Sequence, residues 1–106
     1  MLFELRQYRT HPGQHQNWVK YMEEVIIPFQ TARGMSIMGS WSGEEETNLF
    51  VWIRRFESEA ERERLYRDVY ESDEWKQNIA PRIPEMMDRE QIKVTRMTPT
   101  PRSAMR

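Results

Sequence analysis

A run of five consecutive apolar residues, Leu49–Ile53, stands out in a chain in which 31% of the residues are charged. Side chains of a strand alternate between two faces, so this segment needs apolar cover on both of them. We expect a strand over Asn48–Phe56 that forms a hairpin with Met35–Trp41 through the polar turn between them. Two further segments have strand-like patterns, Leu2–Tyr8 and Gln91–Met97.

The first helix is expected to start at Gln14, after the first strand. Its apolar residues recur at the three-to-four spacing of one helix face, namely Trp18, Met22, Val25, Phe29 and Ala32. Pro28 removes the backbone bond to the carbonyl of Glu24, so we expect a kink there. Gly34 is placed to end the helix in a left-handed conformation.

A second helix is expected after Ser58, since Ser58 and Glu61 form a capping-box signature. A further helical segment begins near Asp73 and is made irregular by Pro81 and Pro84. It carries apolar residues at steps of four, Trp75, Ile79, Ile83 and Met87. The element order, strand–helix–strand–strand–helix–strand, predicts an α+β, ferredoxin-like fold with a four-stranded antiparallel sheet covered by helices on one face.

Alternation along the strands gives an expectation for each face of the sheet. The side under the helices is assigned Phe3, Leu5, Leu49, Val51 and Ile53. The open side is assigned Glu4, Arg6, Tyr8, Ser36, Met38, Ser40, Phe50, Trp52, Arg54, Phe56, Lys93, Thr95 and Met97. Exposing so many large apolar side chains is rare in monomers, so we expect two identical sheets to pack face to face in a homodimer.

Composition narrows the class of protein. At 106 residues the chain is expected to form one domain, 1–106, with a loose C-terminal tail over 98–106. It has no cysteine, no apolar run long enough for a membrane span and no basic-then-apolar leader pattern, which favours a cytoplasmic protein. The net charge of −1 favours neither a nucleic acid nor a membrane surface as partner.

Charged residues set among aromatic ones suggest candidate chemistry. Glu4, Arg6 and Tyr8 could bind an anionic or enol-like ligand, with Arg6 as anion clamp, Tyr8 as proton donor and Glu4 as base. A purely structural ion pair, for instance between Glu4 and Arg6, is the alternative. Arg62 falls in phase with the inner stripe of the second helix and either reaches a pocket or extends to solvent.

A metal or cofactor site is not expected. His11 and His15 have the spacing of a helical metal pair, but Pro12 and Gly13 break the helix that would align them. There is no glycine-rich phosphate loop and no nucleophile-elbow motif.

Three landmarks together resemble the NIPSNAP family. The first is Glu4-Leu5-Arg6-x-Tyr8 with Pro12-Gly13, and the second is Gly34-Met35 with Gly39-x-Trp41. The third is Phe50-Val51-Trp52-Ile53-Arg54-x-Phe56, which is followed by Arg62, Tyr70, Trp75-Lys76, Arg96 and Pro99. Some members carry a His-x-Trp-x-Tyr pattern on the third strand, where this chain has Trp52, Arg54 and Phe56. A role that rests on that histidine therefore does not carry over.

The resemblance implies a homodimeric α+β barrel with a cavity between sheet and helices or between two sheets, and the sequence leaves assembly into a higher oligomer open. It implies no particular reaction; related dimeric barrels include cofactor-independent oxygenase and isomerase-like enzymes, and others bind haem through a histidine. The leading hypothesis is a protein that binds or transforms a small molecule without metal. Its candidate ligand-binding residues are Glu4, Arg6, Tyr8, Trp52, Arg54 and Arg62. The alternative is a non-catalytic interaction or scaffold domain whose sheet face only mediates dimerisation.

Overall fold

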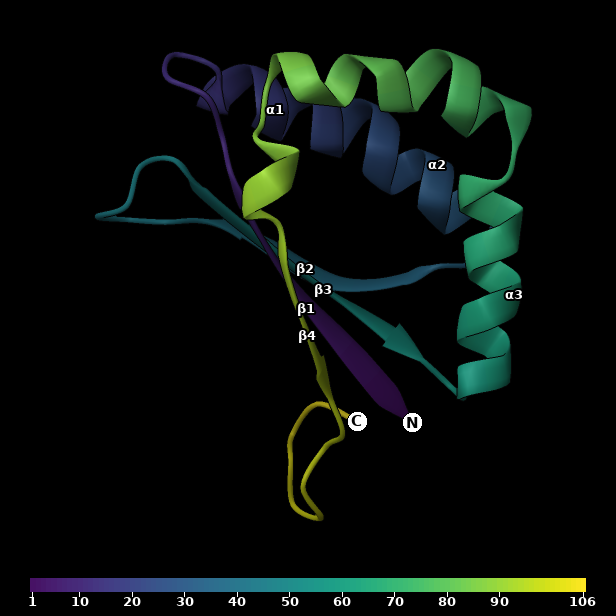
Figure 1. The fold of residues 1–106 in the computed structure, drawn as a ribbon. Coiled ribbons are helices and arrows are strands. Elements are labelled where there is room, and N and C mark those ends of the chain that lie inside the picture. The colour runs from purple at the N-terminus through teal and green to yellow at the C-terminus, as the bar shows by residue number, and fades with distance from the viewer.

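A computed structural model describes residues 1–106 and contains one four-stranded antiparallel sheet. The strands are β1 (Leu2–Arg9), β2 (Ser36–Ser42), β3 (Leu49–Phe56) and β4 (Lys93–Met97). Their order across the sheet is β2-β3-β1-β4, so β1 and β3 lie in the centre (Figure 1). The predicted α+β, ferredoxin-like fold is confirmed, with β4 starting two residues later than expected.

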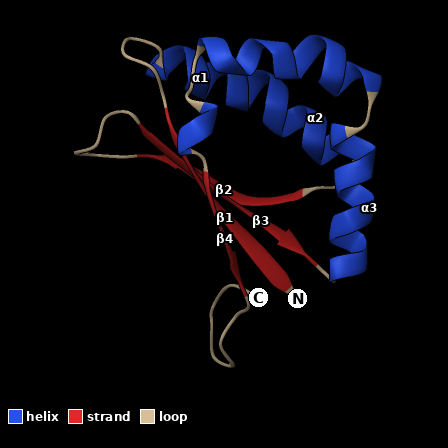
Figure 2. Ribbon diagram, viewed as in Figure 1, coloured by secondary structure: helices blue, strands red, loops and turns tan.

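The helices gather on one side of the sheet (Figure 2). A first helical stretch runs through α1 (His15–Tyr21), the π-helical turn η1 (Met22–Ile26) and α2 (Ile27–Ala32). After β3 come α3 (Glu59–Tyr70), the π-helical η2 (Trp75–Ile79) and the 3₁₀ segments η3 (Ala80–Glu85) and η4 (Arg89–Gln91). None of these helices combines the length and the apolarity needed to cross a bilayer.

Pro28 is accommodated by a widened turn that precedes it. The N–H of Ile27 donates to the carbonyl of Met22, five residues back, and this π-helical turn adds a residue to the helix. The extra residue shifts the buried face, which consists of Trp18, Tyr21, Met22, Ile26 and Gln30. The expected stripe is thus wrong at its C-terminal end, because Val25 and Phe29 are only half-buried and Ala32 is exposed.

The predicted helix boundaries at Ser58 and Gly34 are confirmed. The Ser58 hydroxyl accepts a hydrogen bond from the backbone N–H of Glu61 at 3.1 Å, which satisfies a free donor of the first turn of α3. Gly34 has a φ of +105°, where a side chain would be strained, and a Cβ there would lie 3.1 Å from Leu65. A glycine is therefore needed between α2 and β2.

The expected assignment of the two sheet faces is wrong for the central strands, where the two sets of side chains are exchanged. Lys93, Thr95 and Met97 of β4 pair with residues of the outer face and lie there as expected. The side chains assigned to the open face of the two central strands, Glu4, Arg6, Tyr8, Phe50, Trp52, Arg54 and Phe56, face the helices. All of these except Arg6 are at most 5% exposed within the single chain. Those assigned to the helix side, Leu5, Leu49, Val51 and Ile53, lie on the outer face and are half-buried. Phe3 also lies on the outer face, where it borders the C-terminal segment.

The reason lies in β3, which is apolar at every position from Leu49 to Ile53. A shift of one residue moves a strand's side chains to the other face, and here either choice buries apolar groups. The aromatic set packs under the helices because it has the larger apolar area and because Arg54 finds polar partners there. No partner subunit is needed to bury Phe50 and Trp52.

The outer face remains partly apolar. Trp41 of β2 is 48% exposed, and its indole ring packs against Gly39, where a Cβ would come within 2.7 Å of the ring. The C-terminal segment returns to this sheet, since Arg55 donates from Nε to the carbonyl of Arg106 at 2.8 Å. The centre of the outer face is left to Leu5, Val51 and Ile53.

Candidate functional site

A fully buried ion pair joins the two central strands beneath the helices. Arg54 of β3 donates from Nη2 to Oε1 of Glu4 on β1 at 2.7 Å, and neither side chain has any exposed surface. The two residues are opposite each other in the β1–β3 register, so the sheet itself sets their distance. A buried charge is tolerated only when it is paired and hydrogen-bonded; here the two charges are paired, and of the side-chain nitrogens of Arg54 only Nε lacks a hydrogen-bond partner.

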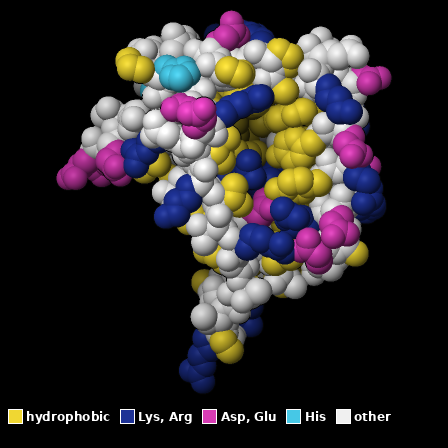
Figure 3. Space-filling view, in the orientation of Figure 1, with side chains coloured by type: hydrophobic (Ala, Val, Ile, Leu, Met, Phe, Trp, Pro, Cys, Tyr) yellow, Lys and Arg dark blue, Asp and Glu magenta, His cyan; other side chains and the backbone are white.

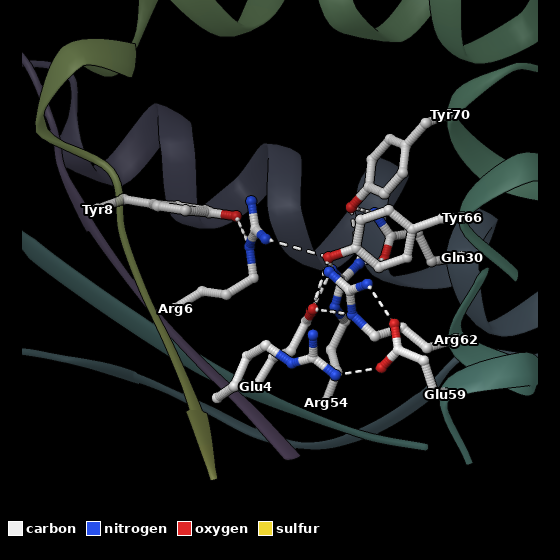
Figure 4. Close-up of polar contacts among 10 residues, drawn as sticks. Glu4, Arg6, Tyr8, Gln30, Arg54, Glu59, Arg62, Tyr66 and Tyr70 are labelled. Atoms are coloured by element: carbon white, nitrogen blue, oxygen red, sulfur yellow. Dashed lines mark hydrogen bonds and ion pairs between the residues drawn. The ribbon is translucent and has the colours of Figure 1, made fainter. Parts of the chain in front are cut away.

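Helix α3 completes the surroundings of the Glu4 carboxylate. Arg62 donates from Nε to Oε2 at 2.6 Å, and the Tyr66 hydroxyl lies 2.7 Å from Oε2 and 2.9 Å from Oε1 (Figure 4). Burial raises the pKa of Glu4, but Arg54, Tyr66 and Arg62 outweigh it, and the net shift is downward. Glu4 is therefore an ionised carboxylate whose oxygens are occupied by three donors.

The other edge of the Arg54 guanidinium is held by α2 and α3. Its Nη1 donates to Gln30 Oε1 at 2.8 Å and to the Tyr70 hydroxyl at 2.7 Å. Burial works to lower the pKa of Arg54, but Tyr70, Tyr66 and Glu4 hold it above its usual value. We call Glu4, Gln30, Arg54, Arg62, Tyr66 and Tyr70 the ion cluster.

Arg6 lies beside the ion cluster with different partners. Its Nε donates to the Tyr8 hydroxyl at 2.7 Å, and its Nη1 is 3.5 Å from the Tyr66 hydroxyl. The nearby carboxylate, Glu4, pairs instead with Arg54 and Arg62. Arg6 is thus a half-buried cation whose only side-chain partners are two phenols.

Arg6 borders a cavity of about 160 Å³ between the sheet and the helices. Figure 3 looks into the hollow, which has hydrophobic side chains on its walls and arginine or lysine side chains near its floor and rim. The lining residues are Arg6, Tyr8, Trp18, Met22, Ile26, Gln30, Trp52, Tyr70, Trp75, Ile83, Met87, Arg89 and Ile92. Two guanidinium groups and no carboxylate are among them, so the cavity carries positive charge.

The structure divides the six candidate residues into two groups. Arg6, Tyr8 and Trp52 line the cavity, whereas Glu4, Arg54 and Arg62 belong to the ion cluster beside it. The suggested pair between Glu4 and Arg6 does not form. Arg62 does reach inward to Glu4, although its side chain remains 20% exposed.

Three members of the ion cluster were missed as candidates. Tyr66 and Tyr70 lie one and two turns after Arg62 on the inner stripe of α3, and that phase was the available signal. Gln30 lies four residues after Ile26 on the face of the first helix that η1 shifts inward. Its burial could not be predicted without the widened turn.

Both histidines lie at the opposite end of β1 from Glu4 and are engaged locally. His15 lies between Thr10 Oγ1, 3.0 Å from its Nδ1, and Ser42 Oγ, 2.9 Å from its Nε2. His11 bonds through Nε2 to the carbonyl of Pro84 at 2.9 Å. Burial lowers the pKa of His15. No group of three potential metal-ligating side chains occurs in the chain.

Several solved structures share the whole fold of this chain. A NIPSNAP family protein from Agrobacterium tumefaciens superposes with a TM-score of 0.88 at 21% identity, covering 99% of this chain and 98% of its own. An uncharacterised NIPSNAP domain protein from Burkholderia xenovorans gives a TM-score of 0.85 at 19% identity, with coverage of 97% and 98%. At these identities the likeness establishes the fold alone.

A more distant likeness is to the crystal structure of an antibiotic biosynthesis monooxygenase. It has a TM-score of 0.69 at 14% identity and covers 95% of this chain and all of the other. No curated protein matches the sequence significantly. The NIPSNAP family model, in contrast, matches residues 3–103, a range that contains all of the sheet but Leu2, the ion cluster and every residue that lines the cavity. The chain therefore belongs to the NIPSNAP family.

Proposed function

We propose that this protein binds a small organic anion in the cavity between its sheet and its helices. The observation that supports this most strongly is Arg6, a guanidinium that borders an apolar cavity and has phenols as its side-chain partners. A partly desolvated charge without a counter-ion is unfavourable, and an anionic ligand would relieve that cost. Arg54 and Arg62 differ from Arg6 in this respect, since both are paired with the carboxylate of Glu4 and Arg62 is also paired with that of Glu59.

The tyrosine beside Arg6 suits the same ligand. Burial raises the pKa of the Tyr8 hydroxyl more than the Arg6 guanidinium lowers it, so Tyr8 is protonated at neutral pH. Its hydroxyl accepts from Arg6 and still has its own proton to donate. A carboxylate or an enolate at this position could accept hydrogen bonds from both side chains.

The size of the cavity limits the ligand to about one ring. An engineered apolar protein cavity of about 150 Å³ is known to hold benzene, and the present cavity has a volume of about 160 Å³. Three tryptophans, Trp18, Trp52 and Trp75, line it and offer flat apolar surface. A single-ring carboxylate such as benzoate therefore has the size, polarity and charge that the cavity accommodates.

Thermal unfolding in the presence of small ligands tests the proposal. We expect benzoate and cyclohexanecarboxylate to raise the melting temperature, because a ligand at a hundred times its Kd adds about 2.7 kcal/mol to the free energy of unfolding. Benzamide and benzylamine have the same ring without the negative charge and should have little effect. Equal stabilisation by benzamide or benzylamine, or no response to any carboxylate, would refute the proposal.

We propose in addition that the outer face of the sheet pairs with a second copy of the chain. The support is the half-buried row of Leu5, Val51 and Ile53, with the exposed Trp41 beside it. The same row on both copies is self-complementary about a two-fold axis. Burial of such aliphatic side chains contributes about 1.5–3 kcal/mol for each one that passes from full exposure to full burial.

Light scattering tests this assembly. The wild-type protein should have twice the 13.0 kDa mass of the chain. Val51→Glu places a charge in the middle of the outer face and should yield the monomer. Val94→Glu is the matched control, since Val94 lies at the sheet edge on β4 and is 43% exposed. A monomeric wild-type protein, or a Val51→Glu dimer, would contradict the assembly.

A further inference from the structure

Two buried indole N–H groups at the cavity have no hydrogen-bond acceptor. They belong to Trp18 on α1 and Trp52 on β3, each of which is 1% exposed. Their Nε1 atoms are buried without a partner, and both residues line the cavity. Leaving a buried N–H unpaired is costly, and such groups are rare in native proteins. A third tryptophan in the lining, Trp75, is half-buried, and its Nε1 is not among the buried unpaired atoms.

Two phenols of the lining are also free to donate. Tyr70 accepts hydrogen bonds from Arg54 at 2.7 Å and from Gln30 at 3.3 Å, and Tyr8 accepts one from Arg6. Neither hydroxyl has an acceptor for its own proton within the chain. The close-up in Figure 4 shows Arg6 between the hydroxyls of Tyr8 and Tyr66, with the Tyr70 hydroxyl directed toward Gln30 and Arg54.

The unpaired polar groups of the residues that line the cavity are therefore mainly donors. The side-chain acceptor of the lining, Gln30 Oε1, is taken by Arg54 at 2.8 Å. Arg6 and its phenol neighbours can be satisfied by one carboxylate. The two indoles lie on different elements and need a further acceptor.

We propose that the natural ligand is a cyclic carboxylate that carries a second hydrogen-bond acceptor, such as a ring nitrogen or a ring carbonyl. The carboxylate lies against Arg6, and the second acceptor receives the N–H of Trp52 or Trp18. This inference rests on the proposed function and adds the substrate class to it. A site built to donate a hydrogen bond discriminates strongly against an analogue that lacks the acceptor, because the buried donor then stays unpaired.

Calorimetric titration with isosteric acids tests the inference. Picolinate, nicotinate and isonicotinate differ from benzoate by a single ring nitrogen, which adds an acceptor at a different ring position in each. We expect at least one of the three to bind about tenfold more tightly than benzoate, which is the gain of roughly one well-formed hydrogen bond to a buried donor. Without such a donor the ring nitrogen weakens binding, because its desolvation is not compensated.

Three tryptophan variants locate the donor. Trp52→Phe and Trp18→Phe each remove one unpaired N–H, and the affinity ratio of the preferred acid to benzoate should fall to about one or below in at least one of them. Taking the ratio within each variant cancels the effect of the lost ring volume on both acids. Trp75→Phe is the matched control, because it removes the same volume from the lining without removing a buried unpaired N–H, and it should keep the wild-type ratio. Circular dichroism checks that each variant is folded.

The outcomes distinguish the proposed function, which is binding of a small organic anion, from the inference that the ligand carries a second acceptor. If benzoate binds and all three nitrogen-containing acids bind equally or more weakly, the inference is overturned and the proposed function stands. If the preference persists in both Trp52→Phe and Trp18→Phe, the assignment of the donors is overturned. If neither benzoate nor any of the three acids binds at millimolar concentration, both the inference and the proposed function fail.

Discussion

Replacing Glu4 with Gln is expected to lower the free energy of unfolding by about 3–5 kcal/mol at pH 7, because it leaves a buried charge without its partner. Arg54 has no exposed surface and is neutralised directly by Glu4. The amide keeps the shape of the carboxylate but removes the charge that Arg54, Arg62 and Tyr66 all contact. Urea denaturation monitored by tryptophan fluorescence measures the change.

The same pair predicts how stability depends on pH. The pKa of Glu4 in the folded protein lies below its ordinary value of 4.5, because the cationic and phenolic donors outweigh burial. The stabilisation is therefore fully present above about pH 4.5 and is lost as the pH falls through the lowered pKa. Glu4→Gln has no such titration, so the difference in stability between the two proteins should narrow in acid.

Glu59→Gln is the matched control for this substitution. Glu59 also pairs with Arg62, but its side chain is 45% exposed, and surface ion pairs contribute about 0–1 kcal/mol. A loss below about 1 kcal/mol in Glu4→Gln, similar to that of Glu59→Gln, would show that the buried charge is not held as described. If Glu4→Gln does not fold, Tyr66→Phe gives a milder test with an expected loss of about 1–3 kcal/mol.

Replacing Arg6 with Gln is expected to weaken the binding of benzoate roughly 10- to 100-fold, because hydrogen bonds to charged groups contribute about 1.5–3 kcal/mol. The stability of the ligand-free protein should change by less than about 1 kcal/mol, since Arg6 has phenols and no carboxylate as side-chain partners. A loss of ligand affinity without a loss of stability indicates that Arg6 serves ligand binding and not folding. Calorimetric titration and urea denaturation of the same protein measure the two quantities.

Arg64→Gln is the control for this second substitution. Arg64 is a surface residue of α3, 56% exposed, with a salt bridge of 3.6 Å to Asp68, and its loss should affect neither affinity nor stability appreciably. An unchanged affinity in Arg6→Gln would refute the role of Arg6. A stability loss of several kcal/mol would instead assign Arg6 to the structural cluster around Glu4.

The order of the elements could be read from the sequence because local signals mark most boundaries. Ser58 and Glu61 predict the start of α3, Gly34 predicts the end of α2, and the apolar run of β3 predicts a central strand. These features act within a few residues and do not depend on the rest of the molecule. The ferredoxin-like arrangement follows from their order.

The choice of sheet face could not be read in the same way. Both alternating sets of β3 are apolar from Leu49 to Ile53, and each then contains one arginine, so the pattern is compatible with either orientation. What decides is the packing of the larger aromatic set against helices that are distant in the sequence. Polar partners for Arg54 on those helices, Gln30 and Tyr70, act in the same direction.

The candidate site was predicted in part because the charged residues of β1 and β3 are few and stand among aromatic ones. Arg6, Tyr8 and Trp52 were assigned to the same face of the sheet, and all three border one cavity. The sequence did not show which arginines belong to the ion cluster and which to the cavity, since this depends on which arginine side chain reaches Glu4. That distinction arises from α3, which places Arg62 and Tyr66 beside the carboxylate and leaves Arg6 to the cavity.

A crystal structure of the protein grown with benzoate tests the central claim most directly. The account predicts the aromatic ring inside the cavity between sheet and helices, in contact with Trp52, and the carboxylate within hydrogen-bond distance of the Arg6 guanidinium. A ring bound only on the outer surface, or a carboxylate directed away from Arg6, would contradict it.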